Sequence, residues 1–528
     1  MMTAATFKVF PNLYKDSVTL MQIGAELRLR EGIAEASCIM ATPANLGQLA
    51  DAGLAIDLAV APSDLLVVVR GEPAACEEAI AAAEGMLKSS NTGREADAAA
   101  FRLPLSSIAL GLQRAEAADI ALISVPGDYA AAEALKALAQ GLHVMLFSDN
   151  VAVADERAIK EYARARNLLV MGPDCGTAIV NGIPLGFANV VRRGHIGLVA
   201  ASGTGLQEVT CRIHNEGGGV SQAIGTGGRD LKESIGGITM LQGLAALAAD
   251  PATRVIVLIS KPPAADIAQK ILALATDAGK PVVVHFLGAP PESIRGRGLT
   301  PATSLQHAGD VAVALATGSA APASSGAPTA LQLATVDHMA AGMAPSQSAV
   351  RGLFTGGTFC YEAQLAFRAR GFECRSNAPA EGVALLEKHD GRAGGHVFID
   401  MGDDDYTRGR PHPMIDPALR NAAVLAHAAD PATAAILVDV VLGYGSHPDP
   451  AQALADTLLA AQREARAHGR SLALVAHVCG TEGDPQGRAA QVRKLEAAGA
   501  IIAESNVQAS LICAALAGKL ASRSGGNR

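Results

Sequence analysis

Short apolar runs alternate with longer amphipathic segments along most of this chain. In its first part the pattern predicts strands over Glu35–Met40 and Asp64–Arg70 and helices over Ser17–Glu31, Pro43–Ala52 and Ala74–Lys88. We therefore expect a small α+β domain of ferredoxin-like type over residues 1–90. The polar, small-residue stretch Ser89–Ala100 is typical of a linker.

From Asp119 the pattern becomes strand, loop and helix, repeated. Strands are expected at Ile120–Val125, Val144–Phe147 and Leu168–Met171, and helices at Ala130–Gln140 and Asp155–Arg166. Strands and helices that alternate at this spacing form right-handed βαβ units and a parallel sheet. The pattern predicts a Rossmann-like domain over residues 101–193, with any ligand at the carboxyl ends of its strands.

The second half of the chain contains a repeat. A strand at Gly197–Ala200 runs into Ser202-Gly203-Thr204-Gly205, and Leu353–Phe354 runs into Thr355-Gly356-Gly357-Thr358, each followed by a helical pattern. The same five letters, ADPAT, precede a strand at Ala249–Thr253 and again at Ala429–Thr433. We expect two homologous, doubly wound units, over residues 194–318 and 330–522, joined by a linker at Thr317–Thr329. The second unit carries an insertion around Ser376–Met414.

Composition narrows the class of protein. Hydrophobic residues make up 49% of the chain and aromatic residues 3%, a palette that suits parallel sheets covered by Ala-rich helices. The net charge of −8, without a Lys/Arg cluster, argues against nucleic-acid binding. No apolar run reaches membrane-spanning length, and Met1–Phe10 lacks a signal pattern. The eight cysteines have no C-x-x-C spacing, which argues against a disulfide scaffold or zinc site, so we expect a cytoplasmic protein.

The two strand–turn–helix segments are the main candidates for binding chemistry. A helix N-terminus presents unpaired N–H groups and partial positive charge, and glycines let an anion approach the backbone. The residues expected to bind phosphate are Ser202, Gly203, Thr204, Gly356, Gly357 and Thr358. Each turn alone could equally be an ordinary helix N-cap. Related units often pack about a pseudo-twofold axis, which would aim both helices at one anion.

A second candidate is the segment Gly172–Thr177, of sequence GPDCGT, at the end of a predicted strand. Cys175 is either a nucleophile or a small apolar residue beside a tight turn. Asp174 either orients a substrate or caps a helix. Gly176 and Thr177 are candidate substrate-binding residues.

The insertion supplies a third candidate, Asp400–Asp416. The carboxylates of Asp403–Asp405 can bind Mg²⁺ or simply form a solvated acidic loop, and no metal is assigned. Arg410 can clamp a substrate carboxylate, and His412 is a candidate catalytic residue. Because the loop follows a strand-like segment, we expect it to lie over the phosphate site.

Further candidates follow other predicted strands. His447 is either a general acid/base or a loop histidine. Substrate-binding candidates at such positions are Gly227, Gly228, Arg229, Gly443, Gly445, Cys479, Gly480 and Thr481. Each of these segments also reads as an ordinary turn.

The run GPDCGTAI…GHIGLVAASGTGLQEV is similar to the α-subunit of succinyl-CoA synthetase. The second unit, with its TGGT turn, looks like the carboxyl-terminal domain of that enzyme's β-subunit. With its CGTEGDPQ segment, the whole chain resembles the FdrA group of acyl-CoA-synthetase-like proteins. The resemblance implies a CoA-binding-type domain before two flavodoxin-like domains, whose two helices converge on a phosphate.

Three departures from the family pattern shape the expected function. No Gly-rich turn precedes Asp119, which argues against CoA binding; Arg295–Thr300 lacks the histidine that the family phosphorylates; and no ATP-grasp region is present. Through the FdrA group, the resemblance implies oxamate carbamoyltransferase activity, in which oxalurate and phosphate give oxamate and carbamoyl phosphate. The alternatives are an NDP-forming acyl-CoA synthetase with a separate ATP-grasp chain and a non-catalytic, anion-sensing scaffold. Each enzyme hypothesis implies a small anionic substrate, companion subunits and an oligomer.

Overall fold

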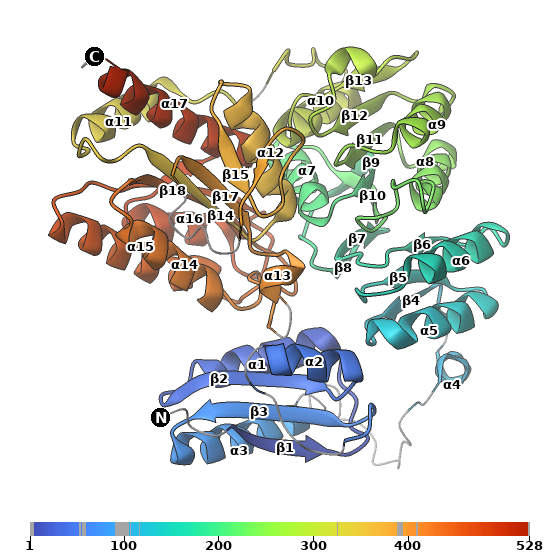
Figure 1. Cartoon of the computed structure of the whole chain (residues 1–528). Helices are drawn as coiled ribbons and strands as arrows, with labels where there is room; N and C mark the ends of the chain where they lie inside the picture. Colours follow the sequence, from blue (N-terminus) through green and yellow to red (C-terminus); the bar gives the residue numbers. More distant parts are fainter. Residues whose placement is uncertain are drawn as a thin grey trace.

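Four β-sheets organise the described part of the chain (Figure 1). The structure is a computed structural model, and it describes residues 5–51, 54, 60–89, 105, 107–115, 117–324, 326–387, 394–407 and 410–525. None of the helices in these ranges combines the length and the apolar character needed to cross a membrane. The predicted linker at Ser89–Ala100 lies outside the described residues except for Ser89, which ends a helix.

The N-terminal domain is built on a three-stranded antiparallel sheet in the order β1-β3-β2. Its elements are β1 (Thr6–Phe10), α1 (Ser17–Arg28), β2 (Ile33–Met40), α2 (Pro43–Asp51), β3 (Leu65–Gly71) and α3 (Pro73–Ser89). Helices α1 and α3 cover one face, but α2 covers the face that an open ferredoxin-like sheet leaves free. The reason is that Leu65–Val69 is apolar on both sides and needs two covering layers.

The second domain has the predicted parallel sheet, in the order β4-β5-β6. Its elements are α4 (Ile108–Arg114), β4 (Ile120–Ile123), α5 (Gly127–Ala139), β5 (His143–Leu146), α6 (Val153–Arg164) and β6 (Val170–Met171). The hairpin β7 (Thr177–Val180) and β8 (Ile183–Gly186) leaves this sheet and pairs with the next one, where Ile179 opposes Ala223. The sheet of the first repeated unit therefore includes residues that precede position 194.

The first repeated unit places five parallel strands in the flavodoxin-like order β13-β12-β11-β9-β10. Its strands are β9 (Arg193–Ala201), β10 (Val220–Gly225), β11 (Val255–Ser260), β12 (Val282–Phe286) and β13 (Leu299–Pro301). Its helices are α7 (Gly203–Asn215), α8 (Ile238–Ala249), α9 (Ala265–Thr276) and α10 (Leu305–Thr317), with a short 3₁₀ turn at Pro291–Ser293.

The second unit repeats this arrangement in the order β20-β19-β18-β14-β17, and adds β15 and β16 at the edge. Its strands are β14 (Ala349–Phe354), β15 (Cys374–Ser376), β16 (Ala384–Leu385), β17 (His396–Asp400), β18 (Thr433–Val441), β19 (Ala473–Cys479) and β20 (Ile501–Ala503). Its helices are α11 (Ala330–Ala341), α12 (Gly357–Arg368), α13 (Asp404–Thr407), α14 (Ala418–Ala429), α15 (Pro450–Ala467), α16 (Arg488–Ala497) and α17 (Asn506–Gly525). The predicted insertion is thus only partly a loop, because β17 takes the place that β10 has in the first unit.

The ADPAT repeat has the same local structure in both units. The carboxylate of Asp250 accepts a hydrogen bond from the Ala252 N–H, and that of Asp430 accepts one from the Ala432 N–H, each at 2.9 Å. Each motif turns the chain from a helix into the third strand of its sheet, β11 or β18. The repeat in sequence is therefore a repeat in structure.

The two units pack together through one shared apolar core. Helices α7 and α10 of the first unit face α12 and α17 of the second, and residues such as Leu206, Val209, Phe359 and Ala363 belong to the same buried cluster. The other helix layers, α8–α9 and α14–α15, cover the outer faces of the two sheets (Figure 1). This packing places the first turns of α7 and α12 at the junction.

Candidate functional site

The two predicted phosphate-binding turns are in direct contact. The hydroxyl oxygens of Ser202 and Thr358 lie 2.5 Å apart, at the first turns of α7 and α12. A side chain at Gly356 would lie 2.9 Å from Cγ2 of Thr204, so glycine is needed for this approach. Because the turns touch, a single anion can contact N–H groups of both helices. Phosphate binding by the six residues itself stays a prediction.

The turn before α7 is capped by its own side chain. Ser202 has extended backbone, and its hydroxyl accepts a hydrogen bond from the Gly205 N–H at 3.0 Å. Gly203 is exposed, so the N–H at the start of this helix can be reached from solvent. The turn is both a helix N-cap and an accessible helix N-terminus, so the two readings of the sequence are compatible.

The turn before α12 is held from behind by a buried carboxylate. Asp439, on β18, accepts hydrogen bonds from the Thr355 N–H at 2.7 Å, the Thr355 hydroxyl at 2.6 Å and the Gly356 N–H at 3.0 Å. No side chain caps α12 itself. Asp439 therefore fixes the turn and leaves the N–H groups of Gly357 and Thr358 for a ligand. The sequence signal for this residue is a lone charge within the apolar strand Ile436–Val441.

One carboxylate and one ammonium group flank the α12 turn. Asp400, at the end of β17, is buried, and an alanine Cβ at Gly357 would lie 2.3 Å from its Oδ2. Burial raises the pKa of Asp400 to about 6, although the nearby charge of Lys261 opposes this. Lys261 follows β11 of the first unit and lies with its ammonium 5.5 Å from the centre of the Tyr361 ring. The sequence drew attention to Asp400 only as the first residue of the segment Asp400–Asp416, and it gave no signal for Lys261.

The GPDCGT segment gives an accessible acid and a buried thiol. Asp174 is reached by solvent but is otherwise surrounded by protein, and desolvation with the charges of Asp149 and Asp404 raises the pKa of Asp174 to about 7. Cys175 is buried against the carbonyl groups of Thr177 and Gly225, and burial raises its pKa to about 12. A thiol in that state does not act as a nucleophile, so the geometry favours the packing role for Cys175.

Thr177 and the Thr226–Asp230 turn support the site from the first unit. Thr177 lies 3.7 Å from a Cβ built at Gly203, although its hydroxyl donates to the Phe187 carbonyl. Gly176 lies near Phe187. In the neighbouring turn Gly227 packs on the Pro173 carbonyl, beside Gly228, and Arg229 binds Glu156 at 3.0 Å. Arg229 is thus tied to α6, while its charge still acts on Asp174.

The segment Asp400–Asp416 of the insertion lies near the α12 turn. Gly402 follows Asp400, and a Cβ at Gly402 would lie 2.6 Å from Nε2 of His412. His412 also faces the Phe187 ring, and burial lowers the pKa of His412 to about 4, which leaves a neutral imidazole at pH 7. Asp404 lies close enough to Asp174 to raise its pKa. These contacts bring the loop near Asp400 and Asp174, while its position over the phosphate site stays a prediction.

Among the described residues of this loop, Arg410 is a cation without a partner. Its guanidinium is half-buried and has no hydrogen-bond or ion-pair partner among the described residues. We predict that Arg410→Lys raises the KM for a carboxylate substrate roughly tenfold, about 1.4 kcal/mol, because lysine keeps the charge but loses the bidentate fork. Steady-state kinetics measure this, and Arg463→Lys, on the outer helix α15, is the control. Unchanged kinetics of an Arg410→Ala variant would remove the residue from the site.

The remaining candidate loops are engaged in contacts between the units. Gly443 and Gly445 pack against Ala188 and Phe187, and Thr481 donates its hydroxyl proton to the Val190 carbonyl. Cys479 and Gly480 are also buried, and Gly480 packs against Leu442. His447 accepts the Asp449 N–H through Nδ1, and burial lowers the pKa of His447. Substrate-binding and catalytic roles for these residues stay predictions, since their recorded contacts are structural.

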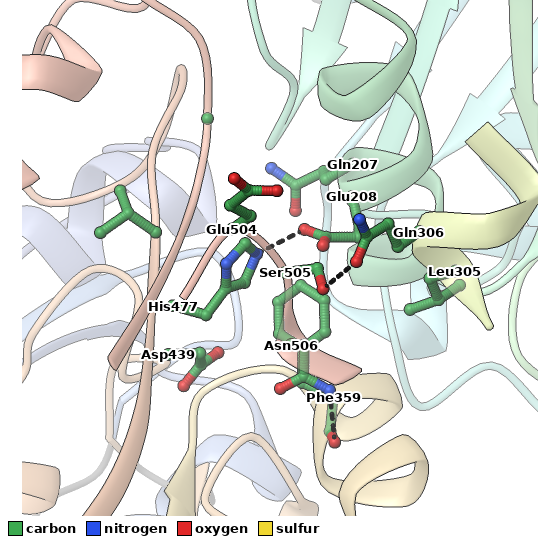
Figure 2. Close-up of polar contacts among 12 residues, drawn as sticks. Gln207, Glu208, Leu305, Gln306, Phe359, Asp439, His477, Glu504, Ser505 and Asn506 are labelled. Atoms are coloured by element: carbon green, nitrogen blue, oxygen red, sulfur yellow. Dashed lines mark hydrogen bonds and ion pairs between the residues drawn. The ribbon is translucent and has the colours of Figure 1, made fainter. Parts of the chain in front are cut away.

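A buried ion pair joins the units beneath the turns (Figure 2). Glu208 on α7 and His477 on β19 lie 2.7 Å apart, and Asn506 and Gln306 lie on either side of them. Glu362, the equivalent of Glu208 in α12, instead accepts the Leu305 N–H at 2.9 Å and the Asn506 amide at 2.8 Å. Each glutamate thus binds the start of the last helix of the other unit.

The surroundings of His307 bear on histidine phosphorylation, whose absence stays a prediction. His307 is buried, with Nδ1 accepting the Thr303 N–H at 3.1 Å and Nε2 bonded to the Pro322 carbonyl at 2.9 Å. Both ring nitrogens are therefore occupied. We predict that incubation with labelled ATP leaves no acid-labile phosphate on the chain. Label recovered on a His307 peptide after digestion would contradict this.

Metal binding finds little support in the described residues. No group of three or more His, Cys, Asp or Glu side chains in these ranges is arranged to hold a metal ion. In the N-terminal domain Cys38 and Cys76 are both buried, and burial raises the pKa of Cys38 to about 12. A thiol with so high a pKa is a poor metal ligand, because the thiolate is the ligand.

Three family models match the chain. They are described as "CoA-ligase", over residues 353–516, "CoA binding domain", over residues 191–288, and "AllF, heavy metal-associated domain", over residues 2–102. The CoA-binding match lies in the first repeated unit and not in the 101–193 region where we expected that domain type. Our expectation against CoA was based on the residues before Asp119, so it does not bear on this match. Within the part of residues 2–102 that the structure describes, no group of three or more His, Cys, Asp or Glu side chains is arranged to hold a metal ion.

Two relatives match the chain over different shares of its length. The chain is 42% identical to "Uncharacterized protein YahF" of Escherichia coli K12, over 95% of this chain and 96% of that protein. It is 26% identical to a Staphylococcus epidermidis "Succinate--CoA ligase [ADP-forming] subunit alpha", over 37% of this chain and 62% of that one.

Among solved structures, an acetyl-coenzyme A synthetase of Ca. Korarchaeum cryptofilum, in complex with phosphate and ADP, matches with a TM-score of 0.31 and 16% identity, over 78% of this chain and 84% of that one. ATP citrate lyase from Methanothrix soehngenii, in complex with citrate and coenzyme A, matches with a TM-score of 0.32 and 13% identity, over 80% and 85% of the two chains.

Proposed function

The chain belongs to the same family as the Escherichia coli protein YahF, and from that premise we propose that it is a subunit of an acid–CoA-ligase-type enzyme that handles an acyl phosphate. The phosphoryl group would lie between the first turns of α7 and α12. The CoA-ligase match favours this acid–CoA ligase over the carbamoyltransferase that the resemblance led us to expect. A companion chain would then supply nucleotide binding.

One observation carries the proposal, namely the 2.5 Å contact between the hydroxyls of Ser202 and Thr358. It brings two helix N-termini from duplicated units to one point. Partial positive charges at both ends stabilise a dianion and the negative charge that develops on the phosphoryl oxygens. Neither helix alone would distinguish an anion site from a helix N-cap.

The proposed reaction needs few protein groups. In acyl transfer to CoA, the thiol sulfur attacks the acyl carbon, the carbon–oxygen bond to phosphate breaks, and the thiol proton leaves with the phosphate. The protein holds the leaving phosphate and orients the acyl group. For orienting the acyl group we propose Asp174, an acid with a pKa near neutrality, and Arg410, whose guanidinium has no partner among the described residues.

A second candidate is transfer of a carbamoyl group to phosphate, as in oxamate carbamoyltransferase. The observation in its favour is the burial of His307 together with the absence of histidine from Arg295–Thr300. A phosphate that acts directly on the acyl donor needs no phosphohistidine. The same turns would bind the phosphate in both reactions.

Acyl phosphates test the proposal without any nucleotide-binding partner. The full chain is incubated with acetyl, propionyl or carbamoyl phosphate, with and without CoA, and thioester and free phosphate are measured. CoA-dependent thioester formation is the expected result. Turnover of carbamoyl phosphate only with oxamate would favour the second candidate. No turnover, combined with no phosphate binding by calorimetry, would reject both and leave a non-catalytic scaffold.

A further inference from the structure

The α12 turn presents an electrostatic problem for an anion. Asp400 lies directly beside it. The Asn377 side chain accepts a hydrogen bond from the Asp400 N–H at 2.8 Å and donates one to the Asp400 carbonyl at 2.9 Å, which fixes the backbone of Asp400. Its Oδ1 accepts the Gly402 N–H at 3.0 Å, so the carboxylate cannot swing away without breaking this bond. An ionised Asp400 repels a phosphate at Gly357, and a site of this kind needs a compensating cation.

Lys261 is the cation that the fold brings to this place. It follows β11 of the first unit, and its ammonium lies over the ring of Tyr361, in the second turn of α12. The side chain is exposed, and no carboxylate lies within 4.0 Å of its ammonium among the described residues. Its positive charge nevertheless acts to lower the pKa of both Asp400 and Cys360. Lys261 is thus a cation without an ion-pair partner at the junction of the two units.

We propose that Lys261 binds the phosphoryl group at the α12 turn, and that Asp400 weakens the affinity of this site for anions. The inference rests on the proposed function and adds a cation that the first unit supplies to the second unit's helix. The lysine ammonium, a point charge on a flexible stem, can follow the phosphoryl group as it changes from acyl phosphate to free inorganic phosphate. Besides Lys261, the charged groups that face Asp400 are Asp403 and Asp439, both acidic.

Sulfate binding to the full-length chain tests this, since sulfate stays a dianion across the working pH range. Calorimetry should show about tenfold weaker binding for Lys261→Met, because a charge-assisted hydrogen bond is lost. Asp400→Asn should bind sulfate more tightly, since asparagine keeps the acceptor for Gly402 without the negative charge. The control is Lys270→Met, an exposed lysine of α9 that pairs with Asp266.

The outcomes separate the inference from the proposed function. If Lys261→Met binds sulfate as the unaltered chain does, while Gly357→Ala does not bind it, the role of Lys261 is wrong and the site stands. If the unaltered chain binds neither sulfate nor phosphate, both proposals fail. Unchanged binding in Asp400→Asn would reject the second half of the inference alone.

Discussion

Replacing Gly357 by alanine is expected to abolish phosphate binding and to lower turnover by about a hundredfold or more, since displacements of about 1 Å can have effects of this size. The new Cβ would lie 2.3 Å from Oδ2 and 3.1 Å from Cγ of Asp400. Asp400 is held by Gly402 and Asn377, and the turn is held by Asp439, so neither neighbour can move freely. The first turn of α12 must therefore shift away from α7.

The equivalent substitution in the first unit is the matched control. At Gly203 an alanine Cβ meets only the Thr177 hydroxyl, at the ordinary contact distance of 3.7 Å. Gly203→Ala should keep the fold and most of the turnover. Phosphate titration by calorimetry and acyl-phosphate turnover measure both variants. Equal effects of the two substitutions would mean that the turns do not differ in the way the structure indicates.

The fold could be predicted largely from local pattern. The alternation of strand and helix, the two Gly-rich turns and the ADPAT repeat indicate a duplicated parallel fold, and each reflects contacts close in sequence. Two features could not be predicted in this way. The β7–β8 hairpin joins the following sheet, and β17 belongs to the sheet although it lies within the insertion. Both depend on pairing between distant strands, which periodicity does not encode.

The candidate site was only partly predictable for a related reason. The turns at Ser202 and Gly356 carry a local signature, so they stood out in the sequence. Lys261 follows β11 without any motif around it, Asp400 only opens the acidic candidate segment, and the packing of the units brings the two together. Thr481 is the converse case, since its Gly/Thr-containing segment stood out in the sequence, while its recorded contact is the structural hydrogen bond to Val190 and its substrate-binding role stays a prediction.

The second large effect is expected beneath the turns, at Glu208. Its partner His477 has Nε2 2.7 Å from Glu208 and Nδ1 3.3 Å from the Ala503 carbonyl, so both ring nitrogens face oxygen acceptors. Burial alone would raise the pKa of Glu208, but the charge and hydrogen bond of His477 outweigh it and hold that pKa below its usual value. The pair therefore stabilises the junction of the units.

Breaking this pair should destabilise the protein strongly. Glu208→Gln removes the carboxylate from this buried pair, and breaking a buried pair by removing one partner typically costs about 3–5 kcal/mol. Thermal unfolding and hydrogen exchange in α7 and α17 measure the loss. Because the Glu208 pKa is lower in the folded state, its contribution is fully present above the unfolded value, about 4.3, and is lost as the pH falls through the folded pKa.

Glu362→Gln, at the equivalent position of α12, should not destabilise the protein as Glu208→Gln does. Among the described residues no cation lies within hydrogen-bond distance of Glu362, and burial raises the pKa of Glu362 to about 7 despite hydrogen bonds from Asn506 and Leu305. A carboxyl whose pKa is raised by folding loses stability as the pH rises from its unfolded value, about 4.3, through about 7. Glutamine keeps an acceptor for the Leu305 N–H and removes this penalty. At pH 8 Glu362→Gln should therefore be neutral or stabilising, while Glu208→Gln is destabilising. If both variants lose the same unfolding free energy at pH 8, the two glutamates contribute equally to stability. The contact between Glu208 and His477 would then have no special role in holding the units together.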